Sequence, residues 1–196
     1  VGSFILHKGD KLWLTDPGGP VYNRKTFGPN RYDIVFCNSR GHSVPVINGK
    51  LQQPGSRFRG TIKVNNLNSS GPKEAVVDMT RAYPKGTVKK LVRTFALDME
   101  TNQVTITDCY SFDRKPRKLE EAFITFEDVD VGPSGRSVQI GSKSKGITLT
   151  TATKGKFSVD TLIEASKEGR TDQPIRRITF VPAALDRNIE ISFAVE

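Results

Sequence analysis

The chain contains almost no run with the spacing of an amphipathic helix, and this absence restricts its fold more than any other feature. Short runs of β-branched and aromatic residues recur instead. Gly, Pro, Asn or Asp separates them at intervals of roughly 8–12 residues, the pattern typical of a sandwich or barrel of short antiparallel strands. The sequence therefore predicts an all-β fold with little helix.

Thirteen segments carry the strand pattern, and a break over residues 66–72 follows the fourth of them. They are residues 11–15, 33–37, 43–47, 57–65, 74–79, 87–98, 103–113, 118–126, 137–140, 146–150, 156–163, 174–181 and 188–195. Asn48-Gly49 offers the two positive-φ positions of a tight hairpin. Pro45 removes one ladder donor, so we expect an edge strand or a bulge there. Helical turns are predicted only for residues 162–168 and 183–187.

A chain of 196 residues is long enough for one domain with a sizeable core. No internal repeat or linker divides it, so residues 1–196 are expected to form one continuous sandwich of two large antiparallel sheets. No window of 18 apolar residues occurs, which excludes a membrane-spanning helix. The first thirteen residues lack the apolar centre of a signal peptide, and the chain opens on Val-Gly. We therefore expect a processed chain or a piece of a longer protein.

The chain has two Cys and two His, and the two Cys are far apart with no Cys-x-x-Cys spacing, so a four-ligand zinc site of the usual kind cannot be built. Cys37 and Cys109 each lie in an apolar, strand-like run. They either form a disulfide or remain buried free thiols, and the sequence leaves both possibilities open.

Lysine and arginine number 30 against 21 aspartates and glutamates, a formal net charge of +9. This surplus raises the local concentration of an anionic partner, either nucleic acid or acidic polysaccharide. No signature of an RNA-recognition motif, an OB-fold or a zinc finger accompanies it, so nucleic acid is the weaker candidate. The chain also lacks a Gly-x-Ser-x-Gly elbow, a phosphate loop and a Gly-x-Gly-x-x-Gly run, which disfavours the usual serine hydrolases and nucleotide-binding enzymes.

His42 is the first candidate for chemistry, because it lies in a polar segment beside Arg40 and Gly41. An imidazole with an ordinary pKa near 6.5 can act as a donor or as a base near neutral pH. The alternative is a structural histidine at the start of a strand, bonded to a backbone carbonyl. His7, next to a Lys-Gly-Asp turn, is expected to be solvated.

A series of motifs follows in order through the first hundred or so residues. They are Asp16-Pro17-Gly18 with Tyr22, Arg31-Tyr32-Asp33, Ser39 to Lys50 with Gln53 and Gly55, Asp78 to Pro84, and Arg93 with Thr105 to Asp108. As a set, these residues resemble the C-terminal β-sandwich of the heparinase II/III-like polysaccharide lyases. The resemblance is weak beyond Asp113.

The resemblance implies a supersandwich-like fold and a place in a larger enzyme. Members of this family join an N-terminal α/α toroid to the sandwich and cleave uronic-acid-containing chains by β-elimination in the cleft between them. Most catalytic residues come from the toroid, which this chain lacks, so the chain alone is expected to be inactive. The sandwich contributes one catalytic His, and His42 matches it. Arg40 and Tyr83 are then expected to contact the acidic polysaccharide.

The same resemblance implies no cofactor and a periplasmic or secreted protein, since large acidic polysaccharides lie outside the cytoplasm. Two departures from the family pattern matter. Ser43 replaces the Asn that often follows the catalytic His. Val44 stands where zinc-containing members have a second His, so we expect no metal. A non-catalytic carbohydrate-binding or scaffolding sandwich is the alternative function, and a nucleic-acid-binding β domain is a weaker third.

Overall fold

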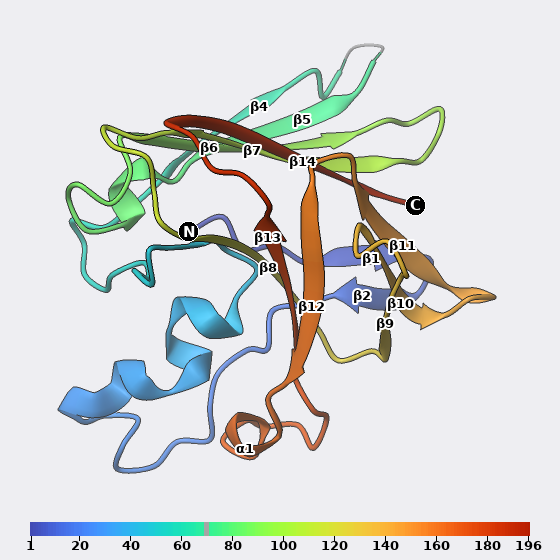
Figure 1. The fold of residues 1–196 in the computed structure, drawn as a ribbon. Coiled ribbons are helices and arrows are strands. Elements are labelled where there is room, and N and C mark those ends of the chain that lie inside the picture. Colours follow the sequence, from blue (N-terminus) through green and yellow to red (C-terminus); the bar gives the residue numbers. More distant parts are fainter. Residues whose placement is uncertain (69–70) are drawn as a thin grey trace.

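A computed structural model describes residues 1–68 and 71–196 (Figure 1). Over these residues, fourteen strands form three antiparallel sheets, with one short α-helix and four 3₁₀ turns. The predicted all-β sandwich with little helix is confirmed. None of the described helical segments has the length and apolar character needed to cross a membrane.

The larger sheet has eight strands in the order β4-β5-β6-β7-β14-β11-β10-β9. The strands are β4 (Thr61–Asn65), β5 (Lys73–Asp78), β6 (Lys90–Leu97), β7 (Val104–Ser111), β9 (Val129–Val131), β10 (Ser137–Ser142), β11 (Lys145–Thr151) and β14 (Asn188–Val195). Strands β6 and β7 correspond to two of the predicted strand segments, 87–98 and 103–113, and pair with each other over their full length as a hairpin. The C-terminal strand β14 pairs with β7 on one side and β11 on the other, at the centre of the sheet.

The smaller sheet has four strands in the order β12-β13-β8-β3, and it lies under the larger one in Figure 1. Its strands are β3 (Val46–Ile47), β8 (Leu119–Thr125), β12 (Gly155–Thr161) and β13 (Arg176–Pro182), and a separate ribbon holds β1 (Leu6–Lys8) and β2 (Lys11–Leu14). Strand β3 is an edge strand directly after Pro45, as predicted. Asn48 and Gly49 both have positive φ, 51° and 73°, as their turn requires.

The core fills the space between the inward faces of the two sheets. Phe123 and Phe180 of the smaller sheet meet Phe193 of the larger sheet edge to face, with ring centroids 4.9 and 5.5 Å apart. Burying each such side chain contributes roughly 1.5–3 kcal/mol. The cluster includes residues from Leu6 to Val195, so both ends of the chain contribute to one core.

A charged network lies within this apolar core and joins the two sheets. Arg93 of β6 donates to both carboxylate oxygens of Asp108 on β7, at 2.8 and 2.5 Å. Its guanidinium also reaches Glu121 of β8 at 3.4 Å, and Tyr110 donates to the other oxygen of Glu121. The side chains of Arg93, Asp108 and Glu121 are all fully buried.

Burial, and then the charge of Asp108, raises the pKa of Glu121 well above its usual range. Burial alone would lower the pKa of Arg93, but the charge and hydrogen bonds of Asp108 outweigh burial and raise the pKa of that guanidinium above its ordinary value. Within the network, burial thus favours the protonated form of Glu121, and Asp108 favours the cationic form of Arg93.

Three local predictions are wrong. Residues 33–37 form 3₁₀ turns, η1 (Pro29–Asp33) and η2 (Val35–Cys37), in place of a strand. The reason is that the amide of Asn38 donates to the carbonyls of Tyr32 and Ile34, which a strand would have used for its ladder. Of the segment 43–47 only β3 is a strand, and residues 183–187 hold no helix.

The sequence reading also omitted the short strands β1 and β9, whereas α1 (Ile163–Ser166) falls within a predicted helical turn. Cys37 is half-buried and Cys109 exposed, and both are free thiols. The described part of the predicted break over residues 66–72 contains no strand, and residues 69 and 70 lie outside the described residues.

Candidate functional site

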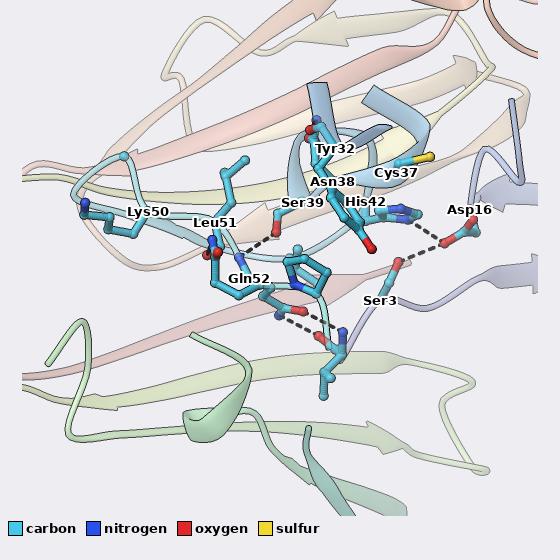
Figure 2. Close-up of a pocket in the computed structure, with 15 residues that line it drawn as sticks. Ser3, Asp16, Tyr32, Cys37, Asn38, Ser39, His42, Lys50, Leu51 and Gln52 are labelled. Carbon is cyan, nitrogen blue, oxygen red and sulfur yellow. Dashed lines mark hydrogen bonds and ion pairs between the residues drawn. The ribbon is translucent and has the colours of Figure 1, made fainter. Parts of the chain in front are cut away.

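His42 lies at the rim of the sandwich, where it lines an open pocket of about 620 Å³ (Figure 2). Its side chain is 25% exposed, so the ring is accessible from the pocket. The pocket walls combine apolar side chains with polar ones that include, besides His42, Ser3, Asp16, Asn38, Ser39, Lys50 and Gln52. Figure 2 shows Asp16 beside His42 at one end of the pocket and Lys50 at the other.

The 3₁₀ turn η3 (Ser39–Gly41) directly precedes His42, and Asn38 is the N-cap of this turn. The Asn38 side chain accepts the backbone N–H of Arg40 at 2.8 Å and so caps this turn. Gly41 is buried, and a Cβ there would lie 2.4 Å from the carbonyl oxygen of Val35. Only glycine allows this close approach of two backbone segments, which sets the direction in which His42 leaves the turn.

The residue after His42 is anchored on three sides. The Ser43 hydroxyl accepts the backbone N–H of Ile124 at 3.0 Å, and the Ser43 carbonyl accepts Arg93 Nη1 at 2.5 Å. The Ser43 backbone N–H donates to the hydroxyl of Ser3 at 3.4 Å. Thus β8 and the core arginine hold the backbone that carries His42, although His42 itself belongs to no sheet.

The imidazole of His42 pairs with Asp16, whose Oδ2 lies 2.8 Å from Nδ1. Burial alone would raise the pKa of Asp16, but the hydrogen bond and charge of His42 lower it, with help from the Gly18 N–H and the Ser3 hydroxyl. The net effect is a pKa below the usual range, so Asp16 is an ionised carboxylate at neutral pH and can only accept. Nδ1 must therefore carry the proton, and Nε2 has no partner among the described residues.

Arg40 and Tyr83 do not join His42. The Arg40 side chain is exposed and does not line the pocket. Burial lowers the pKa of Arg177, and the positive charge of Arg40 lowers it further. Tyr83 is 3% exposed, and its hydroxyl donates to the carbonyl of Pro45 at 2.7 Å. Burial raises the pKa of the Tyr83 hydroxyl, which keeps this group protonated.

Sequence reasoning missed Asp16, Ser3 and Lys50 as members of the site. The sequence assigns Asp16 no role beyond the Asp16-Pro17-Gly18 motif of the resemblance, and in the structure its Oδ1 accepts the N–H of Gly18 at 3.0 Å, as in a turn. It lies 26 residues from His42, and no spacing rule joins the two across two different loops. Both loops are instead fixed on Ile124, whose carbonyl accepts the Thr15 N–H at 2.8 Å and whose N–H donates to the Ser43 hydroxyl at 3.0 Å.

Within the described residues no three His, Cys, Asp or Glu side chains gather closely enough to hold a metal ion. Val44 lines the pocket but is apolar and only 2% exposed, so it adds no ligand to the site. The polar side chains of the pocket are one imidazole, one carboxylate, one lysine, one thiol, hydroxyls and amides. Such a set suits recognition of a hydroxyl-rich, acidic ligand.

Comparison with solved structures finds the same fold in lyases. A heparinase III with methylated lysines matches this chain at a TM-score of 0.70 and 12% identity. The match covers 99% of this chain and 29% of the heparinase III chain. This chain has the fold of a heparinase III domain. The heparan sulfate lyase HepC from Pedobacter heparinus matches at a TM-score of 0.71 and 11% identity, and the match covers 99% of this chain and 30% of the HepC chain.

Another heparinase III structure matches at a TM-score of 0.68 and 13% identity, over 99% of this chain and 28% of its own. This chain thus spans about 30% of the length of the solved structures that it matches. No protein-family model matches the sequence, and a search of curated proteins finds no relative. The likeness therefore lies in the fold.

Proposed function

We propose that this chain is the β-sandwich domain of a larger lyase, which cleaves uronic-acid-containing polysaccharide by β-elimination, and that His42 contacts the uronate. The observation that carries the proposal is the Asp16–His42 pair, which lies in an open polar pocket at the rim of a heparinase III-like fold. The parent protein would then work in the periplasm or outside the cell, where such polymers occur.

In the proposed reaction a base removes the proton on the carbon next to the uronate carboxylate. The electron pair of that C–H bond forms a carbon–carbon double bond, the bond to the glycosidic oxygen breaks, and a proton reaches the departing oxygen. Negative charge builds on the carboxylate in the transition state. A donor held next to that carboxylate stabilises developing charge, which lowers the barrier to the chemical step.

His42 has the geometry for this donor role. Asp16 fixes the ring by accepting Nδ1–H, so Nε2 is the atom available to a ligand. A bound uronate would bring a second anion to the ring, and the protonated imidazole is the form that holds both. Lys50, at the opposite end of the pocket, provides a cation for a neighbouring acidic group on the same polymer.

The test compares His42→Ala with His7→Ala in the longer protein that carries this chain. His7 is exposed on β1 and does not line the pocket, so it is the matched control. Turnover is followed by the ultraviolet absorbance of the new double bond. His42→Ala should lower kcat by about 10²–10⁴-fold, the usual effect of a positioned acid–base group, and His7→Ala should leave kcat unchanged.

We expect no turnover from the 196-residue chain alone, because the remaining catalytic groups and the second wall of the cleft lie in the toroid partner. Unchanged kcat in His42→Ala together with a lower melting temperature would show that the histidine is structural. The chain would then be a carbohydrate-binding or scaffolding sandwich without a catalytic role.

A further inference from the structure

A series of surface cavities leads away from the His42 pocket. The first has a volume of about 780 Å³ and shares Gly49 and Lys50 with that pocket. Its walls add three further cations, Lys85, Arg117 and Lys118. A polymer leaving the His42 pocket on this side would therefore enter a positively charged cavity.

Two more cavities continue the path. One of about 590 Å³ shares Pro84 and Lys85 with the first and adds Arg57 and Arg81. The last, of about 460 Å³, shares Arg81 with its neighbour. It adds three cations of its own, Arg59, Lys89 and Lys90. We call these three cavities together the basic groove.

The basic groove holds most of the net charge of the chain. Its walls contain nine lysines and arginines and one carboxylate, Asp78, so it accounts for eight of the nine net positive charges. One oxygen of Asp78 already has a hydrogen-bond donor, the backbone N–H of Thr80 at 2.9 Å. Of the nine cations only Lys118 has an ion-pair partner in the described part of the chain, Glu120 at 3.0 Å.

Three loops present eight of these nine cations from one side of the molecule, and Lys90 is the first residue of β6 beside them. Figure 1 shows residues 48–60, 79–89 and 112–118 together at the left, where strands of both sheets end. Backbone bonds fix the loops: Lys89 N–H donates to Ser111 O at 2.9 Å, and Thr87 N–H donates to Pro84 O at 3.0 Å. Like charges held together in this way repel one another, and a bound polyanion would relieve that repulsion.

We propose that the basic groove is a second binding site for an acidic polysaccharide, separate from the His42 pocket. It would hold the polymer beside the pocket and so raise the effective concentration of uronate there. The choice of a polysaccharide as occupant rests on the proposed function, since the groove joins the pocket at Gly49 and Lys50.

Nucleic acid fits the groove less well. Single-stranded nucleic acids bind to grooves in which bases stack on free aromatic faces. Phe58 and Tyr83 are the aromatic residues of the basic groove among those described. The guanidinium of Arg57 lies over the Phe58 ring at 5.0 Å, and Tyr83 is 3% exposed. Tyr83 therefore offers no face to a base, and the Arg57 guanidinium covers one face of Phe58.

The test removes three charges from the part of the groove farthest from His42, in the variant Arg59→Ala/Arg81→Ala/Lys89→Ala. The matched control, Lys143→Ala/Lys145→Ala/Lys154→Ala, removes three exposed cations outside the groove. Binding of a fluorescent heparin octasaccharide to the 196-residue chain is measured by anisotropy at several salt concentrations. A duplex DNA of similar charge is the second probe.

The groove variant should bind the octasaccharide about 3- to 100-fold more weakly, with a shallower salt dependence, while the control changes affinity less than about twofold. Equal losses in both variants would mean that net charge alone attracts the probe, and would overturn the proposal. Tighter binding of DNA than of the octasaccharide would overturn the choice of occupant.

The lyase proposal is tested separately. His42→Ala should keep its affinity for the octasaccharide at the groove whatever it does to turnover, because His42 does not line the groove. Normal turnover in His42→Ala would therefore contradict the lyase proposal alone, whereas equal losses of octasaccharide binding in the groove and control variants would contradict the groove proposal alone. All six mutated side chains of the binding test are exposed, so thermal unfolding should be unchanged in both variants.

Discussion

The buried network of Arg93, Asp108 and Glu121 allows a sharp prediction, because its two acids are expected to differ in charge. The raised pKa of Glu121 favours its protonated form, so Glu121→Gln replaces one neutral acceptor and donor by another and should change the free energy of unfolding by less than about 1 kcal/mol. In Asp108→Asn, Glu121 at 3.4 Å can lose its proton and replace the missing carboxylate, at an intermediate cost. The double variant leaves Arg93 buried without a carboxylate, which should cost about 3–5 kcal/mol.

The assay is urea or thermal unfolding at pH 7, with the double-mutant cycle as readout. For a chain of this size the double variant should melt about 6–20 °C below the parent, and its loss should exceed the sum of the two single losses. If Glu121→Gln costs as much as Asp108→Asn, then Glu121 is an ionised partner of Arg93 and the assigned charges are wrong.

The same assignment fixes a pH dependence. Unfolded glutamate ionises near pH 4.3, whereas the raised pKa of Glu121 keeps it protonated in the folded state. Folding therefore takes up a proton above that pH, and the stability that Glu121 contributes falls as pH rises toward its folded pKa. Glu121→Gln should gain stability relative to the parent between about pH 4 and pH 8. A constant difference across that range would contradict the protonated state.

Three further predictions concern the site. Gly41→Ala should destabilise the chain by about 1–3 kcal/mol in thermal unfolding, because the new Cβ would lie 2.4 Å from a backbone oxygen. His42→Ala should raise the pKa of Asp16 toward its ordinary value in a carboxyl NMR titration, since the hydrogen bond and charge that lower it are removed. Tyr83→Phe should lower stability by about 1 kcal/mol and leave octasaccharide binding and turnover unchanged, because the hydroxyl donates to Pro45 inside the core.

The strands were predictable wherever their stability is local to a hairpin or visible in the pattern of apolar residues. β6 and β7 show this, since they form one long hairpin whose alternation is plain in the sequence. Residues 33–37 show the limit. Ile34 and Phe36 alternate as a strand would, yet they pack on Ile124 and Ile175 from 3₁₀ turns. An apolar run does not reveal that a side-chain amide will satisfy the backbone in place of a neighbouring strand.

For the site, the sequence indicated one residue and missed its surroundings. The polar segment around His42 pointed to a loop at the rim of the sheets, and the pocket lies there. Asp16 could not be paired with it, because the two meet only after β2 has been placed beside β8, through the bond from Thr15 N–H to the carbonyl of Ile124 at 2.8 Å. Arg40 lies two residues before His42 in sequence, but its exposed side chain does not line the pocket.

The core network and the pocket are linked through Arg93, and this link explains why a charged group is kept in an apolar core. A hydrophobic replacement of similar volume often stabilises such a site. Arg93, however, also donates to the carbonyls of Gly2 and Ser43, at 3.0 and 2.5 Å. These carbonyls belong to segments outside any sheet, so an apolar side chain would leave them unsatisfied at about 1–3 kcal/mol each. Arg93 therefore stabilises the irregular backbone that carries His42.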